Sequence, residues 1–381
     1  MYYIMHRDKI VAEADEQSIT GIYEKELCPA CFFVGQDLDF WLKGRYIDVH
    51  RSHSRRLFKA LRLKTDADLC DIIDIGHGVS ITDNWWIKRK SDTASEYKTL
   101  KEFNEEISNI AFYGSPINDF NIKGYTELGT VGSYEKTWKF INGSWYIMKQ
   151  GNKAELVSEY FAYSFLKEMN VPVAEYSILH SSTAMGFEQD YIISKDFTDN
   201  ARYDFEPFCN YFNDNEEYDY IIPRLKQLET DNNCSGLAAQ YVEMCLYDAL
   251  LFNVDRHNQN AGFLRDSSSG RIVSLAPCYD YNLAMAATKT PIFNQSGDLM
   301  KFFVESDLCM DMIDNIKCPA KDDIRLALEK AVEQTKKAFP KDSIDYSVFT
   351  DYVLNAYDYF FSALQKYPLN SESLDNKCSK K

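Results

Sequence analysis

The sequence has no stretch of about 18 apolar residues free of charge, the length that a helix needs to cross a bilayer. Its start, MYYIMHRDKIVAEADE, lacks the cationic segment and apolar core of a secretory signal. Basic residues are in deficit, because 42 lysines and arginines face 58 acidic residues, for a formal net charge of −16. A field of that sign repels nucleic-acid phosphates and anionic membranes. We therefore expect a soluble, cytoplasmic protein with no membrane segment and no direct nucleic-acid binding.

Paired cysteines are also scarce. The ten cysteines are scattered along the chain with no signal peptide, which favours reduced thiols over a disulfide framework. Cys28 and Cys31 in CPAC have the C-x-x-C spacing of a redox dithiol or of half a zinc site. No second pair of this kind or paired histidines follows nearby, so four metal ligands are not assembled locally. The favoured interpretation is a turn around Pro29 with two small apolar thiols.

The chain has 381 residues, of which 45% are hydrophobic, so it is long enough for more than one compact core. No internal repeat with a period of 20 to 50 residues is visible. Residues 1–118 mix a strand-like start with basic and aromatic segments, and Gly114 and Pro116 mark a plausible boundary. We predict an N-terminal accessory region here. Its aromatic segment SITDNWWIKRK fits either core packing or partner docking, and core packing is favoured.

Residues 119–197 have the pattern of a small sheet that carries one helix. TWKFI and SWYIMKQ are separated by Asn142 and Gly143, a strong signal for a hairpin whose turn residues both need positive φ. KAELVSEYFAYSFLKEMN then has apolar residues at helical spacing. VPVAEYSIL and QDYIISKDF predict two further strands.

Residues 198–368 are mainly helical in pattern. Long amphipathic runs occur in SGLAAQYVEMCLYDALLFNV, DDIRLALEKAVEQTKKAF and YSVFTDYVLNAYDYFFSALQKY. Residues 369–381 are polar and predict a flexible tail. The fold class expected is α+β: a small β-rich lobe, a larger helical lobe with a cleft between them, and the N-terminal accessory region.

The segment NVDRHNQN carries the strongest functional signal. Asp255 and Asn260 have the D-x-x-x-x-N spacing of a kinase catalytic loop, where the aspartate accepts the proton of the attacking hydroxyl and the asparagine binds magnesium. A second, charged magnesium ligand is needed, and Asp280 in LAPCYDYN fits this role. The strand-like RIVSLA precedes it, so a hairpin would return Asp280 beside Asn260. Taken singly, each of these residues is equally typical of an ordinary turn.

The expected small lobe supplies groups for the nucleotide phosphates. The loop LGTVGSYEKT precedes a strand, and its glycines let backbone N–H groups approach phosphate oxygens. Lys149 lies in the next strand, and Glu159 on the following helix is placed to pair with it, although Glu155 competes for that role. Taken alone, Lys149 is also typical of a solvated strand lysine and Glu159 of surface charge on an amphipathic helix, but the chain order of the whole set favours a kinase. The loop residues expected to contact ATP are Thr130, Gly132, Ser133 and Tyr134.

These segments together resemble the HipA-like serine/threonine kinases, a bacterial family related to protein kinases and phosphoinositide kinases. The resemblance rests on GSYEKT, YIMKQ, SEYFAY, LFNVDRHNQNAGFL and LAPCYDYN, over about residues 125–285. D-R-H-x-x-N followed by L-A-P-x-Y-D is its most specific part. Where many relatives have a lysine, this chain has Gln259, so one positive charge near the phosphates is missing.

The resemblance implies roles for further residues. ISKDF would be the hinge that meets adenine through backbone groups, which adds Lys195, Asp196 and Phe197 to the ATP site. His257 would either orient Asp255 or donate to a phosphate, and the alternative is a buried structural histidine bonded to backbone. Relatives phosphorylate their own glycine-rich loop, and an antitoxin-like or other regulatory partner is a further expectation.

We therefore expect an enzyme, an ATP- and Mg²⁺-dependent kinase that phosphorylates serine or threonine hydroxyls of a protein substrate and of itself. Two alternatives remain open. D-R-H also occurs in phosphoinositide kinases, which favours a lipid or small-molecule kinase. A nucleotide-binding pseudokinase scaffold would usually lack a metal ligand or the lysine, and this sequence has candidates for each.

Overall fold

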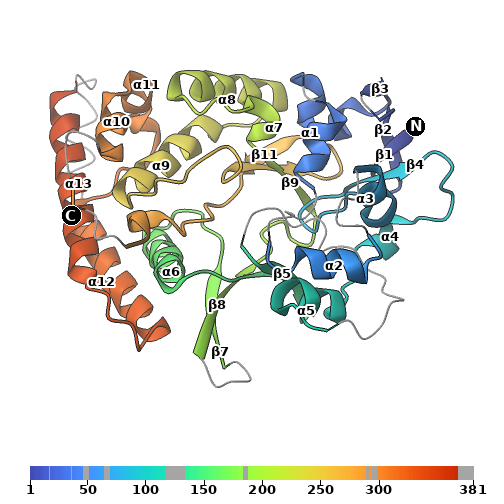
Figure 1. Ribbon diagram of the computed structural model, residues 1–381. Coiled ribbons are helices and arrows are strands. Elements are labelled where there is room, and N and C mark those ends of the chain that lie inside the picture. The colour runs from blue at the N-terminus through green and yellow to red at the C-terminus, as the bar shows by residue number, and fades with distance from the viewer. Residues whose placement is uncertain are drawn as a thin grey trace. The chain divides into compact units, whose positions relative to one another are not determined.

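The computed structural model describes residues 1–16, 18–35, 37–45, 51–63, 69–116, 134–182, 188–288, 292–293 and 298–367 (Figure 1). The chain forms two compact units. The first comprises Met1–Gly151, Leu179–Asn213 and Gly262–Val273, and the second comprises Asn152–Ile178, Asp214–Ala261 and Ser274–Lys381. The first unit thus combines N-terminal residues with strands from much later in the chain. The division into 1–118, 119–197, 198–368 and 369–381 remains a prediction.

The N-terminal residues build a four-stranded sheet in the order β3-β2-β1-β4. Its strands are β1 (Tyr2–His6), β2 (Lys9–Ala14), β3 (Ile19–Ile22) and β4 (Trp85–Arg89). Strand β1 pairs antiparallel with both β2 and β4. Trp85 and Trp86 are 2% and 1% exposed, so the core interpretation of SITDNWWIKRK is confirmed.

Short helices accompany this sheet in the first unit. Asn104 caps the start of α5, because its side chain accepts a hydrogen bond from the N–H of Ile107, and Gly114 ends it with a φ of 62°. The helices and 3₁₀ turns are α1 (Leu38–Lys43), α2 (Ser54–Ala60), α3 (Leu69–Gly76), α4 (Tyr97–Leu100), α5 (Glu105–Tyr113), α7 (Cys209–Phe212), η1 (Lys25–Leu27) and η2 (Ala30–Phe33).

A second sheet has the order β5-β6-β8-β7. Its strands are β5 (Lys136–Ile141), β6 (Ser144–Lys149), β7 (Tyr176–Ser182) and β8 (Glu188–Lys195). The turn residues Asn142 and Gly143 have φ values of 50° and 81°, so the predicted hairpin and its turn chemistry are confirmed. The two further strands that the sequence predicts are β7 and β8.

A third sheet has the order β11-β10-β9, from β9 (Tyr203–Pro207), β10 (Gly262–Asp266) and β11 (Ile272–Leu275). Gly262 begins β10 and pairs with Pro207. A Cβ at this glycine would lie 2.6 Å from the carbonyl oxygen of Glu206, which is too close for any larger residue without moving backbone. The strand that follows the DRHNQN loop therefore pairs with β9 only if it starts with glycine.

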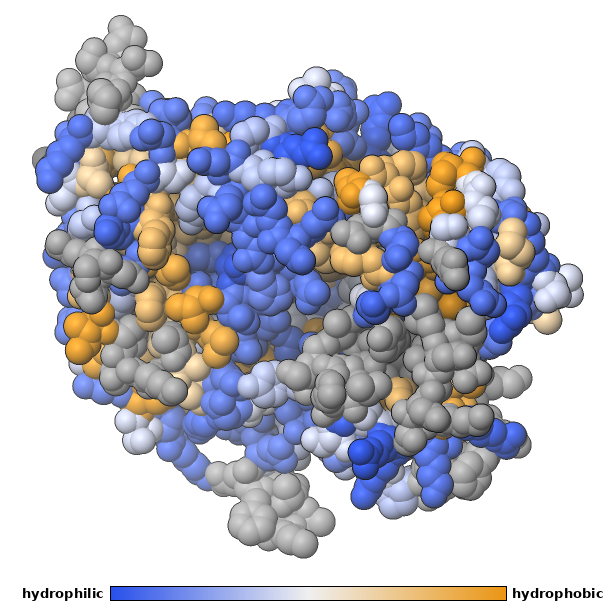
Figure 2. All heavy atoms as spheres, turned by 45° about the horizontal axis from the view of Figure 1, so that its top comes forward, coloured by the Kyte–Doolittle hydropathy of each residue, from blue (hydrophilic) through white to orange (hydrophobic). Residues whose placement is uncertain are grey.

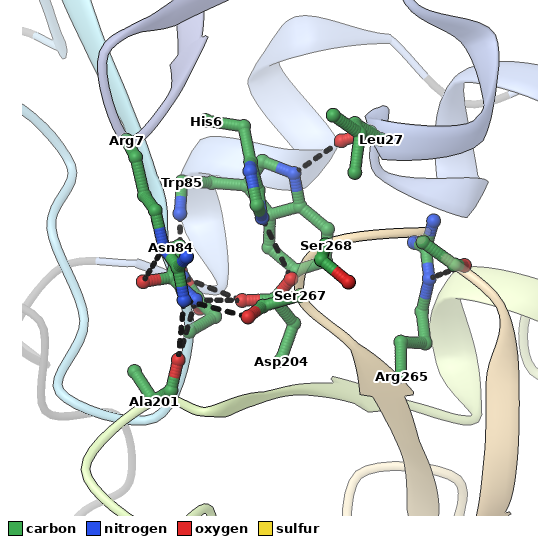
Figure 3. A network of polar contacts seen from close by, with 12 residues as sticks. His6, Arg7, Leu27, Asn84, Trp85, Ala201, Asp204, Arg265, Ser267 and Ser268 are labelled. Carbon is green, nitrogen blue, oxygen red and sulfur yellow. Dashed lines mark hydrogen bonds and ion pairs between the residues drawn. The ribbon is translucent and has the colours of Figure 1, made fainter.

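Buried polar contacts hold the N-terminal sheet to the third sheet within the first unit (Figure 3). Asp204 Oδ1 accepts hydrogen bonds from the backbone N–H of Asn84 at 2.8 Å and from its Nδ2 at 2.6 Å. Asp204 Oδ2 lies 2.7 Å from His6 Nε2. Arg7 donates to Ser267 Oγ at 2.6 Å. Asp204 is 1% exposed, and a carboxyl group that is buried to this extent needs hydrogen-bond partners within the protein.

The second unit is mainly helical. Within it α6 packs against α12 and η4, and α9 packs against α8, α10 and α13 (Figure 1). Its elements are α6 (Lys153–Glu168), α8 (Tyr218–Asn232), α9 (Leu237–Leu250), α10 (Leu299–Glu305), α11 (Asp307–Asp311), α12 (Lys321–Ala338), α13 (Tyr346–Lys366), η4 (Ala284–Thr288) and η5 (Ile313–Asn315). The long helices predicted around residues 153–170, 235–254, 321–339 and 346–367 are confirmed.

Among the helices that the structure describes, none combines the length and the apolar content that a bilayer crossing requires. Hydrophilic residues cover much of the face drawn in Figure 2, and hydrophobic residues occur between them in separate patches.

Replacing Asp204 by alanine tests the polar network. The change removes the acceptor of the backbone N–H of Asn84 and one acceptor of its Nδ2, which keeps the carbonyl of Ala201. Each buried donor without an acceptor costs about 1–3 kcal/mol, so we expect the free energy of unfolding to fall by about 3 kcal/mol. Asp199→Asn is the control, because Asp199 lies 3.6 Å from Arg202 with both side chains more than 60% exposed, and asparagine keeps its left-handed φ of 55° while removing the charge. It should change stability by no more than about 0.5 kcal/mol. Equal urea midpoints for the two variants would contradict the assignment.

Candidate active site

The loop from Asp255 to Asn260 follows α9 and is held by its own hydrogen bonds. The N–H of Asn260 donates to the carbonyl of His257 at 2.8 Å. Asn260 Nδ2 donates to the carbonyl of Asp255 at 3.0 Å, which fixes the orientation of the amide. Asn260 Oδ1 is then the atom available to a ligand, since it accepts no hydrogen bond from the described residues. The predicted D-x-x-x-x-N spacing therefore closes one compact turn.

Asp255 and His257 are both half-buried in this loop. The carboxylate of Asp255 makes no hydrogen bond or ion pair with the described part of the chain, so its oxygens are open to a substrate hydroxyl. His257 Nδ1 accepts the N–H of Gln259 at 3.2 Å, the backbone contact that the structural interpretation expects. Because Nδ1 is an acceptor, a ring proton of neutral His257 lies on Nε2, the nitrogen left for a phosphate or for Asp255.

Asp280 has a φ of 60°, in the left-handed region that residues other than glycine, asparagine and aspartate seldom adopt. Its N–H donates to the hydroxyl of Tyr176 at 3.2 Å. The segment before it is anchored at Cys278, which exchanges backbone hydrogen bonds with Pro172 and Ala174 at 2.8 and 2.9 Å. Hydrogen bonds with the segment that follows α6 thus hold Asp280 and its neighbours in place.

Two contacts join the Asp255–Asn260 loop to the segment of Asp280. Tyr279 donates its hydroxyl to the carbonyl of Gln259 at 2.7 Å. Arg256 Nη1 donates to the carbonyl of Tyr279 at 3.1 Å and also to the carbonyl of Asn260. The structure therefore brings Asn260 and Asp280 together on two cross-linked backbone segments of the second unit.

Sequence reasoning missed Arg256, its partner Asp248, and Tyr279. Arg256 stands inside the D-R-H motif, and Asp248 interrupts the apolar run CLYDALL of α9. An aspartate at a helix position that is otherwise buried needs a cationic or hydrogen-bonded partner, which is the signal that could have found the pair.

The donors in this region suit a hard divalent cation. Mg²⁺ prefers oxygen ligands, and the amide of Asn260 and the carboxylate of Asp280 supply them. The amide oxygens of Asn253 and Asn282 are buried without a hydrogen-bond partner in the described residues. Buried oxygens of this kind are normally satisfied by an ion or an ordered water. No group of three or more histidine, cysteine or acidic side chains is placed to hold a metal ion in the described ranges, so a cation here would need phosphate or water oxygens as well.

On α6 the structure separates the two candidate partners of Lys149. Glu155 closes a capping box with Asn152, with both reciprocal hydrogen bonds at 3.0 Å, so its side chain serves the helix start. Glu159 lies one turn further on and is 2% exposed, which rules out plain surface charge. A buried carboxylate needs a cation or several hydrogen-bond donors, and its pairing with Lys149 remains a prediction.

The remaining ATP-site candidates that the structure describes lie in the first unit. Lys149 is the last residue of β6, in register with Ile192 of β8. Lys195 is exposed and ends β8. Asp196 is 9% exposed; burial raises the pKa of its carboxyl, against hydrogen bonds from Thr198 and Asn200 that lower it. These bonds show that the Asp196 side chain caps its own turn.

Part of the backbone of the expected hinge already forms hydrogen bonds within the protein. The N–H of Asp196 donates to the carbonyl of Trp145 at 2.9 Å, so an adenine contact would have to use other backbone groups of 193–197. The ring of Phe197 packs edge-on against Phe205, with centroids 5.5 Å apart. Tyr134 is exposed just before β5. Thr130, Gly132 and Ser133 lie outside the described residues.

The CPAC motif has the features of core packing. Cys28 and Cys31 are free thiols, 1% and 0% exposed. Burial raises the pKa of the Cys28 thiol to about 12 and raises that of Cys31 well above its usual range. Thiols that stay protonated are poor nucleophiles and poor metal ligands. The turn interpretation is therefore favoured by the structure.

Comparisons with known proteins place the chain in a family. The family model described as the HipA-like C-terminal domain matches residues 130–339, more than half of the 381 residues. The chain belongs to the HipA-like family, and the recognition made from its motifs is confirmed. No protein among those with curated descriptions matches this sequence.

Solved structures with a similar fold are known. HipA of Shewanella oneidensis MR-1, solved with HipB and its operator DNA, has a TM-score of 0.53 and 13% identity, over 96% of this chain and 97% of that chain. The Helicobacter pylori proinflammatory kinase CtkA has a TM-score of 0.42 and 17% identity, over 61% of this chain and 93% of that chain. The α+β, kinase-like fold class predicted from the sequence is confirmed.

The raised thiol pKa values predict the reactivity of the CPAC pair. Below pH 9, Cys28 and Cys31 should be alkylated by iodoacetamide far more slowly than the partly exposed Cys234, because little of either buried thiol ionises. Peptide mass spectrometry after a timed pulse measures the labelling of each cysteine, and labelling in urea provides the fully accessible reference. Rapid native labelling of Cys28 would show an exposed, reactive dithiol instead.

Proposed function

We propose that this protein is an ATP- and Mg²⁺-dependent kinase that transfers the γ-phosphoryl group of ATP to a serine or threonine hydroxyl of a protein. The observation that carries the proposal is the cross-linking of the Asp255–Asn260 loop to the segment of Asp280 in the second unit. It joins the Asp255 carboxylate, which makes no hydrogen bond with the residues that the structure describes, to two oxygen ligands suited to a divalent cation. Membership of the HipA-like family supports the same conclusion.

The roles follow from the contacts. Asp255 accepts the hydroxyl proton as the oxygen attacks the γ-phosphorus and the bond to the ADP oxygen breaks. Asn260 Oδ1 and Asp280 would hold Mg²⁺, which when bound neutralises charge on the phosphates. The chain itself contributes positioning and fixed dipoles, which dominate phosphoryl transfer because its transition state is loose.

Lys149, Glu159 and the loop from Thr130 to Tyr134 are proposed to bind the nucleotide phosphates, and residues 193–197 the adenine. The burial of Glu159 supports its role as an orienting partner for a lysine. Thr130, Ser133 and Tyr134 are the nearby hydroxyls for self-phosphorylation. His257 is proposed to act at Asp255 or at a phosphate through Nε2.

We further propose a regulatory protein as partner. Shewanella HipA was solved with HipB and operator DNA, and this chain's net charge of −16 favours contact with a protein over direct contact with DNA. The same charge opposes anionic lipid surfaces, which favours a protein substrate over a phosphoinositide.

Two substitutions test the proposal. Asp280→Asn should reduce Mg²⁺-dependent phosphate transfer by at least about 100-fold, because the charged cation ligand is lost while asparagine keeps the left-handed backbone. Asp255→Asn should reduce transfer by about 10²–10⁴-fold while nucleotide binding is kept, since only the proton acceptor is removed. Asp322→Ala, at a side chain 93% exposed on α12, is the matched control.

The measurement is mass spectrometry of the purified protein after incubation with ATP and Mg²⁺, run in parallel with phosphoinositide-containing vesicles. Phosphate on serine or threonine of the protein supports the proposal. Transfer only to lipid would identify a lipid kinase, and an ATP-dependent thermal shift without any transfer would identify a nucleotide-binding scaffold. Wild-type rates for Asp280→Asn would show that the metal assignment is wrong.

A further inference from the structure

A buried ion pair lies behind the candidate metal residues. Arg256 Nε donates to Asp248 Oδ2 at 2.8 Å and Nη2 donates to Oδ1 at 3.0 Å, a bidentate arrangement. The side chains of Arg256 and Asp248 are 12% and 7% exposed. Asn253 Nδ2 also donates to Asp248 Oδ1 at 2.9 Å. Because Asp248 lies in α9, the guanidinium is anchored to a rigid helix.

The third nitrogen of the same guanidinium faces the site. Nη1 donates to the carbonyls of Asn260 and Tyr279, and the guanidinium carbon lies 4.9 Å from the ring centroid of Tyr281. The guanidinium therefore fixes the backbone at Asn260 and at Tyr279. Asn260 is one proposed metal ligand, and Tyr279 directly precedes the other, Asp280. Its geometry sets the spacing of the two backbone segments.

The charge of Arg256 persists despite its surroundings. Burial acts to lower its pKa, but the neighbouring Asp248 carboxylate raises the pKa well above the usual range. A lysine at this position would also be charged but has no planar fork, so it cannot bond the carboxylate bidentately and reach both carbonyls.

We propose that Asp248 and Arg256 are positioning residues that hold Asn260 and Asp280 at the spacing required for a divalent cation, with the hydroxyl of Tyr279 as a second, weaker tie. The inference rests on the proposed function, because it assumes that Asn260 and Asp280 bind the metal. It assigns to Arg256 no contact with substrate. Residues that orient metal ligands in this way typically contribute 10–100-fold to metal affinity or activity.

The test measures metal binding without turnover. Mn²⁺ replaces Mg²⁺ as an EPR probe, and its affinity is titrated in the presence of a non-hydrolysable ATP analogue. We expect Arg256→Lys to weaken Mn²⁺ binding about 10–100-fold, and Tyr279→Phe to weaken it about 2–10-fold through the loss of one hydrogen bond. Metal-free binding of the analogue should be unchanged in both variants.

Arg265→Lys is the matched control. Arg265 in β10 forms a comparably buried pair with Glu206 at 2.5 Å and donates to the carbonyls of Gly270 and Cys28. The substitution removes the same fork from a pair that belongs to the first unit. It should lower the thermal unfolding temperature as Arg256→Lys does, while the Mn²⁺ affinity stays at the wild-type value.

The outcomes separate the two proposals. Wild-type Mn²⁺ affinity in folded Arg256→Lys overturns the positioning role, and so does an equal loss in Arg265→Lys. If Arg256→Lys does not fold, Tyr279→Phe decides, and an unchanged affinity there overturns the inference. Wild-type protein that binds Mn²⁺ with the analogue but never transfers phosphate contradicts the proposed function alone. A wild type that binds no Mn²⁺ contradicts both.

Discussion

The contact between the Asp248 carboxylate and the Arg256 guanidinium supports the part of the candidate site that lies in the second unit. Neither the Asp255–Asn260 loop nor the segment of Asp280 belongs to a helix or a described strand, so their carbonyl groups need donors from elsewhere. Arg256 supplies two such donors from one rigid plane. Without its partner on α9, the cost of a buried positive charge would exceed what those hydrogen bonds return.

In the first unit, buried charged side chains are likewise stabilised by hydrogen bonds and ion pairs. Asp204 in β9 is buried and accepts hydrogen bonds from Asn84, just before β4, and Arg265 in β10 pairs with Glu206 and donates to the carbonyl of Cys28. Hydrogen bonds therefore join residues of the N-terminal region to strands β9 and β10, which lie far later in the chain. The boundary near residue 118 remains a prediction.

The helices and the hairpin were predictable because their signals are local. The apolar spacing of α6, α9, α12 and α13 and the Asn-Gly turn each specify structure within one short window. Pairing of β1 with β4 was not predictable, because more than 70 residues separate the strands and no local pattern encodes a partner. The D-x-x-x-x-N spacing identified Asp255 and Asn260, whereas Asp248 looks like ordinary helix charge until Arg256 is seen beside it. The commitment of Asp196 to its own turn likewise depends on Thr198 and Asn200 folding back.

The left-handed backbone at residue 280 limits which substitutions this position can accept during evolution. Only glycine, asparagine and aspartate adopt that conformation at little cost, so most exchanges at this position would disturb the fold as well as the chemistry. Asparagine and glycine are the exceptions, since each keeps the backbone while removing the negative charge. A descendant that abandoned catalysis but kept its architecture would be expected to carry one of these two residues there.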